Sequence, residues 1–157
     1  RKSGKAVLIG GGIGIPPMLA LAKALKAEGA EVSVVLGYRD GDLFLKKEFE
    51  PYADVYVSTE DGSVGTRGNV IDAIRENGLD ADTIYACGPM PMLRGVKAYA
   101  AEKETEAQIS LEERMACGIG ACLGCVCNST GVDSHSHVHN KRVCKDGPVF
   151  NAEDVTL

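Results

Sequence analysis

Short β-rich runs alternate with longer helical patterns over the first 111 residues, and no other feature constrains the fold as strongly. The runs that we predict as strands are 6–9, 31–36, 54–58, 83–86 and 106–111. The helical patterns that separate them cover 16–29, 43–49, 69–78 and 92–103. Such alternation requires right-handed crossovers and a parallel sheet covered on both faces. The sequence therefore predicts an α/β fold with a five-stranded, doubly wound parallel sheet.

This rhythm stops at residue 112, where a segment rich in Cys, Gly, His and Asn begins. We therefore divide the chain into a domain at 1–111 and a small, irregular, Cys-rich segment at 112–157. A segment of this size builds little core of its own, so something else must hold it in shape.

A glycine-rich loop, GGGIGIPPM, follows the first predicted strand. Glycines let the backbone approach a ligand closely, and Pro17 suits the first turn of the following helix. The N–H groups at such a helix start favour an anion, typically a diphosphate. We therefore expect the loop formed by Gly10, Gly11, Gly12 and Gly14 to approach an anionic ligand. Because Ile15 replaces the third glycine of G-x-G-x-x-G, a turn that only packs strand against helix stays an alternative.

A second candidate stretch, YACGPMPML, ends the fourth predicted strand. In open parallel sheets, ligands bind beyond the carboxyl ends of the strands where the strand order reverses, and the first and fourth strands flank that point. We therefore expect Cys87, Gly88 and Pro89 to face the same crevice as the glycine loop. The alternative is that Cys87 only fills the core.

The two stretches resemble the nicotinamide-binding domain of the ferredoxin-NADP reductase family. The resemblance implies that Gly11, Gly12 and Gly14 hold the pyrophosphate. It also implies that Cys87 lies beside the nicotinamide, where hydride passes to a flavin. Cys87 is therefore our candidate catalytic residue, which positions the nicotinamide face rather than acting as a nucleophile. Many members of that family have Thr where this chain has Ile13, so a hydroxyl contact from that position is missing.

The loop after the third predicted strand, STEDGSVGTRG, bears on which nicotinamide cofactor is bound. Glu60 and Asp61 would repel the 2′-phosphate of NADP and could accept hydrogen bonds from ribose hydroxyls, which favours NAD. Arg39, after the second strand, and Arg67 leave NADP open. A solvated turn is the other interpretation of the two acidic residues.

Cys117, Cys122 and Cys125 follow the spacing C-x4-C-x2-C, and Cys144 comes after eighteen further residues. This is the plant-type spacing for a 2Fe-2S cluster, whose fourth ligand arrives from a distance. The small residues between the cysteines leave room for backbone N–H groups to surround the cluster sulfides. Cys127 is predicted to be a bystander, because the C-V-C pair points its side chains oppositely in an extended chain.

Zinc is the main alternative occupant, because His135, His137 and His139 lie nearby and both thiolates and imidazoles bind zinc. Structural zinc sites usually combine paired C-x2-C or H-x3-H units, and the chain has one C-x2-C. A zinc-held tail would make the chain a non-catalytic interaction module. A disulfide framework is disfavoured, because the sequence shows no secretory signal.

The stretches LEERMACGIGACLGCVC and HNKRVCKDGPVF resemble the electron-transfer subunit of NAD-linked dihydroorotate dehydrogenase. The resemblance implies a 2Fe-2S cluster on the four cysteines, bound NAD, and FAD held mainly by a β-barrel upstream of Arg1. The implied partner is the FMN-containing catalytic subunit, in a heterotetramer of pyrimidine biosynthesis. Related subunits of NADH-dependent ferredoxin:NADP oxidoreductases and of sulfide dehydrogenases have similar tails, which leaves the partner open.

The implied electron path runs from dihydroorotate through the partner's FMN, the cluster and FAD to NAD+. A flavin must stand between the two ends, because nicotinamide exchanges electron pairs as hydride and an iron-sulfur cluster exchanges single electrons. The chain opens directly with the nucleotide-binding strand, so we expect it to lack most FAD contacts.

Charge and hydrophobicity argue against two classes of partner, nucleic acids and membranes. A net charge of -5 without a basic stripe argues against nucleic acid. The sequence has no run of about 18 apolar residues that could span a bilayer. We therefore predict a cytoplasmic oxidoreductase subunit that binds neither nucleic acid nor membrane.

Overall fold

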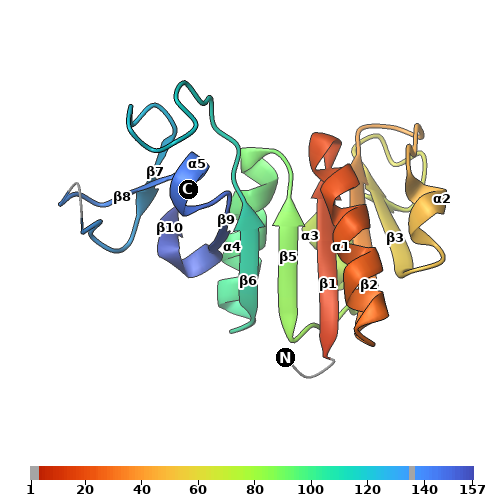
Figure 1. Ribbon diagram of the computed structural model, residues 1–157. Helices are drawn as coiled ribbons and strands as arrows, with labels where there is room; N and C mark the ends of the chain where they lie inside the picture. The colour runs from red at the N-terminus through yellow and green to blue at the C-terminus, as the bar shows by residue number, and fades with distance from the viewer. Residues whose placement is uncertain (1–3, 135–136) are drawn as a thin grey trace.

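The computed structural model describes residues 4–134 and 137–157. Its central strands are β1 (Lys5–Gly11), β2 (Glu31–Tyr38), β3 (Asp54–Thr59), β5 (Thr83–Cys87) and β6 (Glu106–Ser110). They are parallel and lie in the order β3-β2-β1-β5-β6, so β1 and β5 flank the reversal of strand order, as predicted (Figure 1). The α/β fold class is confirmed, and each of these strands begins within one residue of its expected start.

The sheet extends beyond the five expected strands at both edges, to a seven-stranded order β4-β3-β2-β1-β5-β6-β9. At one edge β4 (Thr66–Arg67) pairs in parallel with β3. At the other, β9 (Val149–Asn151) comes from the Cys-rich segment and pairs antiparallel with β6. Strands of two and three residues are too short to show an alternating pattern, which is why the sequence did not reveal them.

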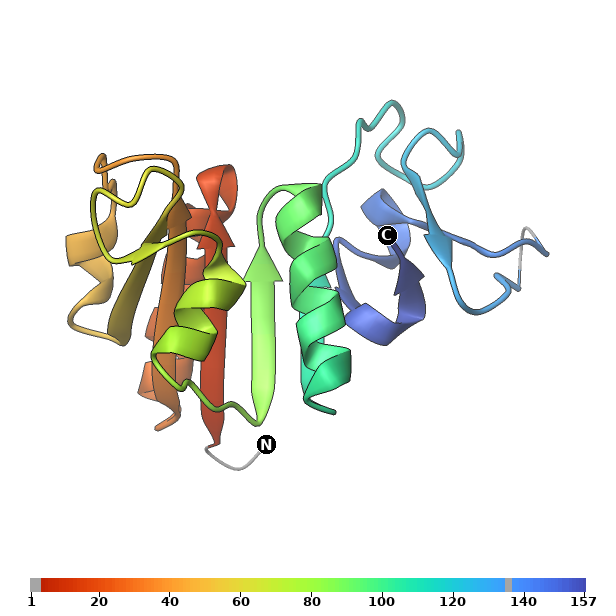
Figure 2. The same cartoon turned by 180° about the vertical axis from the view of Figure 1, so that it is seen from behind.

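Helices cover both faces of this sheet (Figures 1 and 2). They are η1 (Gly12–Gly14), α1 (Ile15–Ala27), α2 (Lys46–Phe49), α3 (Val70–Glu76) and α4 (Met90–Glu102). The start of α3 shows why a helix begins there. The Asn69 side chain accepts hydrogen bonds from the N–H groups of Ile71 and Asp72, and the Asp72 carboxylate accepts the N–H of Asn69. This capping box satisfies donors that the first turn would otherwise leave unpaired.

Strand β1 separates two apolar clusters, because its side chains alternate between the faces. Val7 and Ile9 pack with the cluster that contains Val96 of α4. Leu8 packs with the other cluster, which contains Ile15 of α1. A sheet buried on both faces holds its strand ends rigidly, and those ends carry the candidate site.

The Cys-rich segment, expected to be irregular, contains a small antiparallel sheet in the order β10-β7-β8. Its elements are β7 (Val126–Ser129), β8 (Asn140–Arg142), α5 (Val143–Asp146), η2 (Ala152–Asp154) and β10 (Val155–Thr156). Each is four residues or shorter, so hydrophobic periodicity could not reveal it.

This segment packs directly on the sheet and on α4. Phe150 and Val155 belong to the same apolar cluster as Val96. The ammonium of Lys97 on α4 donates to the carbonyl of Ala152 at 2.6 Å and to the carbonyl of Val155. The α/β domain and the Cys-rich segment therefore share one core.

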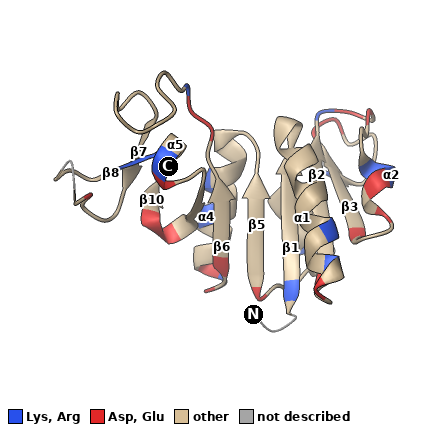
Figure 3. Ribbon diagram, viewed as in Figure 1, with Lys and Arg blue, Asp and Glu red and all other residues tan. Residues whose placement is uncertain are grey.

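Two surface features bear on partners. None of the helices in the described parts of the chain combines the length and the apolar character needed to cross a bilayer. Figure 3 shows acidic and basic residues interspersed along the helices and loops of the face in view.

Replacing Lys97 by Met should loosen the Cys-rich segment, because the carbonyls of Ala152 and Val155 lose their charged donor. We expect the local free energy of unfolding of β7 and β10 to fall by about 1–3 kcal/mol. Amide hydrogen exchange measures this. Lys26→Met, at an exposed position on α1, is the matched control. Unchanged exchange in K97M would show that the ammonium does not hold the segment.

Candidate functional site

The structure brings the glycine loop and the C-G-P turn together at the carboxyl ends of neighbouring strands. Gly10 pairs with Cys87 across β1 and β5. A Cβ on Gly14 would overlap the carbonyl of Cys87 and would lie 2.7 Å from the nitrogen of Gly88. On Gly11, a Cβ would lie 3.3 Å from Cδ of Pro89. The two loops therefore touch through their backbones, and only glycine permits the contact at position 14.

Beside this contact the glycine loop is open to solvent. Gly12 has φ +54 and is exposed, and a Cβ built there meets nothing within 4 Å. Pro16 and Pro17 follow in the first turn of α1, so the loop leads into the positive end of a helix dipole. An anion can reach the backbone N–H groups at this point.

Cys87 is 4% exposed, and its side chain belongs to the same apolar cluster as Leu8 and Ile15. Burial raises its pKa, and the charge of Glu112 adds to the effect, whereas a hydrogen bond with the Ser110 side chain lowers it. The net shift is upward, so the thiol is protonated at neutral pH. A neutral, packed thiol can support a ring lying against it but is a poor nucleophile.

The two acidic candidates in the loop after β3 differ in their surroundings. The Asp61 carboxylate accepts the N–H of Ser63 at 2.9 Å, and hydrogen bonds from Ser63 lower its pKa. The Asp61 N–H donates to the carbonyl of Arg39 at 3.2 Å, which ties this loop to the loop after β2. The exposed Glu60 side chain has no such bond within the turn in the described structure. Asp61 therefore has hydrogen bonds on both its carboxylate and its backbone N–H, whereas the Glu60 side chain is exposed.

Cys117 and Cys122 form one pair of thiols in an exposed loop. The N–H groups of Ala121 and Cys122 donate to Sγ of Cys117 at 3.3 and 3.4 Å. The N–H of Gly124 donates to Sγ of Cys122 at 3.4 Å. Hydrogen bonds from the backbone of Ile119 and Cys122, the Cys122 thiol and the Ala121 backbone lower the pKa of Cys117 to about 6. The loop therefore stabilises a thiolate, the form that binds metal.

Cys125 and Cys144 form the second pair. The N–H of Cys144 donates to Sγ of the buried Cys125 at 3.4 Å, and the N–H of Val143 donates to the Cys125 carbonyl at 3.0 Å. The hydrogen bond with the Cys125 thiol, burial, and the charges of Cys125 and Cys117 raise the pKa of Cys144. A Cβ built on Gly120 would lie 2.8 Å from Cδ of Lys145, so the loop between Cys117 and Cys122 lies beside the residue that follows Cys144.

These donors fit a two-iron cluster. Each iron of a 2Fe-2S centre takes two protein sulfurs, and N–H groups directed at sulfur are the second-shell contacts that such centres use. Among residues 4–134 and 137–157, no three His, Cys, Asp or Glu side chains are grouped to hold one metal ion. The backbone contacts associate Cys117 with Cys122 and Cys125 with Cys144.

Cys127 and the histidines are the remaining candidates in the Cys-rich segment. Cys127, on β7, is half-buried and packs against the main core, and burial raises its pKa. Nδ1 of His139 lies 3.1 Å from the carbonyl of Thr130. His137 is exposed, and His135 lies outside the described residues.

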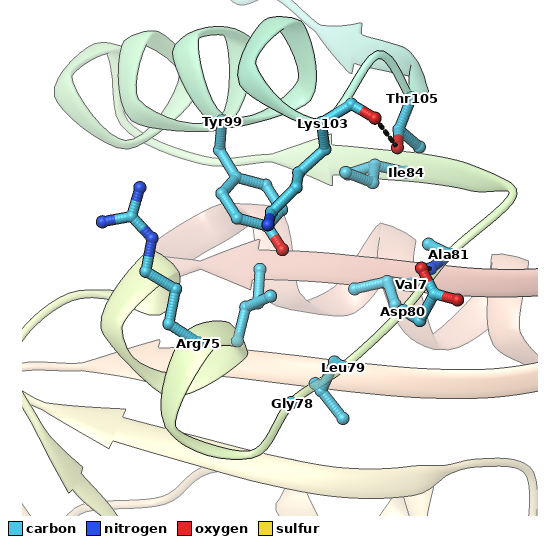
Figure 4. Close-up of a pocket in the computed structure, with 11 residues that line it drawn as sticks. Val7, Arg75, Gly78, Leu79, Asp80, Ala81, Ile84, Tyr99, Lys103 and Thr105 are labelled. Atoms are coloured by element: carbon cyan, nitrogen blue, oxygen red, sulfur yellow. Dashed lines mark hydrogen bonds between the residues drawn. The ribbon is translucent and has the colours of Figure 1, made fainter.

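The cysteine loop and the glycine loop lie at the same end of the molecule, the end at which the parallel strands have their carboxyl termini (Figure 1). A hollow of about 310 Å³ opens at the opposite end, between the last turns of α3 and α4. Figure 4 shows Arg75, Tyr99 and Lys103 at its rim and side, with Leu79 from the loop before β5. This hollow is separate from both candidate sites.

Sequence reasoning missed one residue of the Cys-rich segment, Arg142. Its side chain is buried beside the cysteine loop and contacts Asp146 four residues later. The sequence did carry a signal for this contact, because an Arg and an Asp four residues apart flank Cys144, a candidate ligand.

A glycine loop over a parallel sheet, a buried thiol opposite it and two thiol pairs at the same edge define an NAD-binding oxidoreductase domain joined to an iron-sulfur segment. Residues 8–98 match the oxidoreductase NAD-binding domain, and residues 112–156 match the iron-sulfur cluster binding domain of dihydroorotate dehydrogenase B. The chain belongs to the oxidoreductase NAD-binding family, as a member that carries this iron-sulfur domain.

Curated relatives bear a matching name. The chain is 48% identical to the "Dihydroorotate dehydrogenase B (NAD(+)), electron transfer subunit" of Bacillus velezensis, over 97% of this chain and 57% of the relative. It is 46% identical to the subunit of the same name from a Geobacillus species, over 98% of this chain and 58% of the relative. The chain thus spans somewhat over half the length of these relatives.

A solved structure supports the fold. The chain superposes with a TM-score of 0.85 and 31% identity on the NADH-dependent reduced ferredoxin-NADP oxidoreductase, covering 97% of this chain and 54% of that one. That protein was described in relation to flavin-based electron bifurcation. The expected relation to ferredoxin reductases is therefore supported by structure as well as by sequence.

Replacing Gly14 by Ala should force the two loops apart, because the added methyl group overlaps the backbone of Cys87. We expect a loss of about 1–3 kcal/mol in the free energy of unfolding. NADH affinity should fall about tenfold or more, as 1.4 kcal/mol corresponds to a factor of ten. Thermal denaturation and fluorescence titration with NADH measure the two effects.

Gly131→Ala is the control for this substitution, because a Cβ at Gly131 meets nothing within 4 Å. It should leave both quantities unchanged. A G14A protein that binds NADH as tightly as the wild type would contradict the importance of the loop contact.

Proposed function

We propose that the protein is the NAD-binding and iron-sulfur part of an electron-transfer subunit, which carries electrons between a partner redox protein and NAD+. One observation carries the proposal. The two thiol pairs lie at the same end of the molecule as the contact between the glycine loop and the C-G-P turn. The names of the relatives support it. Residues 1–111 would supply the nucleotide site, and residues 112–157 the cluster site.

The proposed nucleotide contacts come from three loops, and they are Gly11, Gly12, Gly14, Glu60, Asp61, Cys87, Gly88 and Pro89. The open backbone at Gly12 would hold the diphosphate. Cys87 would support one face of the nicotinamide as a neutral thiol, which orients the ring for hydride transfer. Of the two acidic residues, Glu60 is the better candidate for a ribose hydroxyl, since one carboxylate oxygen of Asp61 already accepts the N–H of Ser63.

We propose Cys117, Cys122, Cys125 and Cys144 as the ligands of a 2Fe-2S cluster. When bound, such a cluster supplies reversible one-electron chemistry. The protein's own part is to hold the sulfurs in two pairs and to direct backbone N–H groups at them, which favours their charged form. The pair at 125 and 144 is anchored to the core, whereas the pair at 117 and 122 lies in the exposed loop.

A flavin must join the two sites, because hydride transfers two electrons and the cluster transfers one. We propose that FAD is bound mainly by the part of the relatives that this chain does not span. We further propose that the partner is an FMN-containing dihydroorotate dehydrogenase subunit of pyrimidine biosynthesis, within a heterotetramer. A cytoplasmic location suits six free cysteines, which a reducing compartment keeps as thiols.

A ferredoxin partner is the second candidate, favoured by the likeness to the NADH-dependent ferredoxin-NADP oxidoreductase. The identity of 48% to a dihydroorotate dehydrogenase subunit, against 31% to that structure, favours the first candidate. Isolation of the co-purifying subunit decides between them. An FMN protein that oxidises dihydroorotate supports the first, whereas a ferredoxin-linked protein without that activity contradicts it.

Alanine at each of the four proposed ligands should prevent assembly of the cluster, because the set contains no spare sulfur in a suitable place. Cys127→Ala should retain it, since Cys127 is neither part of the C-x4-C-x2-C spacing nor its distant fourth ligand. Visible absorption, iron content and acid-labile sulfide after anaerobic reconstitution measure assembly. A colourless C127A protein, or a C144A protein with wild-type iron and sulfide, would contradict the ligand assignment.

A further inference from the structure

Arg142 is the one charged residue with less than a tenth of its surface exposed among residues 4–134 and 137–157. Its Nε and Nη2 atoms donate to the two carboxylate oxygens of Asp146 at 3.1 and 3.4 Å. Nη2 also lies 3.7 Å from Oδ2 of Asp133. Nη1 donates to the carbonyl of Gly120 at 3.4 Å. The guanidinium thus joins three segments of the Cys-rich part.

These contacts reach each segment that carries a proposed ligand. Gly120 lies in the loop between Cys117 and Cys122. Arg142 pairs with Val126 in the β7–β8 ladder, directly after Cys125. It also precedes Cys144 by two residues, at the point where β8 passes into α5. Arg142 is therefore linked to the cysteine loop through its guanidinium, to the strand after Cys125 through its backbone, and to Cys144 through its place in the chain.

A buried guanidinium is an inefficient way to stabilise a small segment, because desolvation offsets most of the attraction to its carboxylates. Apolar side chains of similar volume would pack as well. The charge itself therefore suggests a further role. Four thiolates on two irons make a strongly negative centre, and a nearby cation favours the reduced, more negative state.

We propose that Arg142 is a positioning residue for the iron-sulfur cluster. Its guanidinium fixes the cysteine loop through Gly120, and its charge raises the reduction potential of the cluster. The inference rests on the proposed function, since it requires a cluster on the four cysteines. Asp146 and Asp133 serve to orient the guanidinium, and the planar fork of Arg is needed to contact Asp146 and Gly120 together.

The test compares Arg142→Met and Arg142→Lys in the reconstituted protein, with exposed Arg94→Met on α4 as the matched control. We measure the rate at which a chelator removes iron and the reduction potential by EPR-monitored titration. R142M should lose iron about 10- to 100-fold faster than the wild type, as with other second-shell contacts. Its reduction potential should shift to more negative values.

The R142K variant retains the positive charge but lacks the planar guanidinium group. Its reduction potential should therefore stay near the wild-type value, whereas its iron loss should be faster. R94M should match the wild type in both measurements. If R142M does not fold, R142K decides: faster iron loss supports the inference, and wild-type iron loss overturns it.

The inference is also overturned if R142M keeps the wild-type rate of iron loss and reduction potential, or if R142K shifts the potential as far as R142M. Failure of the wild-type protein to take up iron and sulfide is a different result. It would overturn the proposed function, and the inference with it.

Discussion

The backbone contact between Gly14 and the Cys87–Gly88 turn is the constraint on which the nucleotide site depends. It exists because β1 and β5 are parallel neighbours whose carboxyl ends lie side by side. Hydrophobic side chains on both faces of the sheet keep these ends in register. Any side chain at position 14 would separate the loops, so their close contact follows directly from a missing Cβ.

The same part of the fold connects the glycine loop and the C-G-P turn to the cysteines. Helix α4 begins at Met90, directly after the C-G-P turn, and its Lys97 holds the segment that leads to β10. Strand β9 adds this segment to the edge of the main sheet. A displacement of the cluster site relative to the nucleotide site would therefore disrupt a shared core. That rigidity suits electron transfer, which needs fixed distances between centres.

Much of the fold could be predicted because the central strands and their helices are long enough to show periodic hydrophobicity. The meeting of the glycine loop with Cys87 also followed from the rule for parallel sheets. Strands β4 and β9 could not be predicted, because they form only through tertiary pairing. The spacing of the cysteines indicated the ligand set, but not its division into pairs or the burial of Arg142. The use of Asp61 within its own turn likewise depends on a contact with Ser63 that spacing alone cannot reveal.

The central claim is that the four cysteines hold two irons rather than one metal ion. X-ray absorption at the iron edge of the reconstituted protein tests it most directly. We predict that each iron has four sulfur neighbours and one iron neighbour, with two irons and two acid-labile sulfides per chain. A protein that instead retains one tightly bound zinc ion per chain, with no iron-iron scattering and no labile sulfide, would contradict the account.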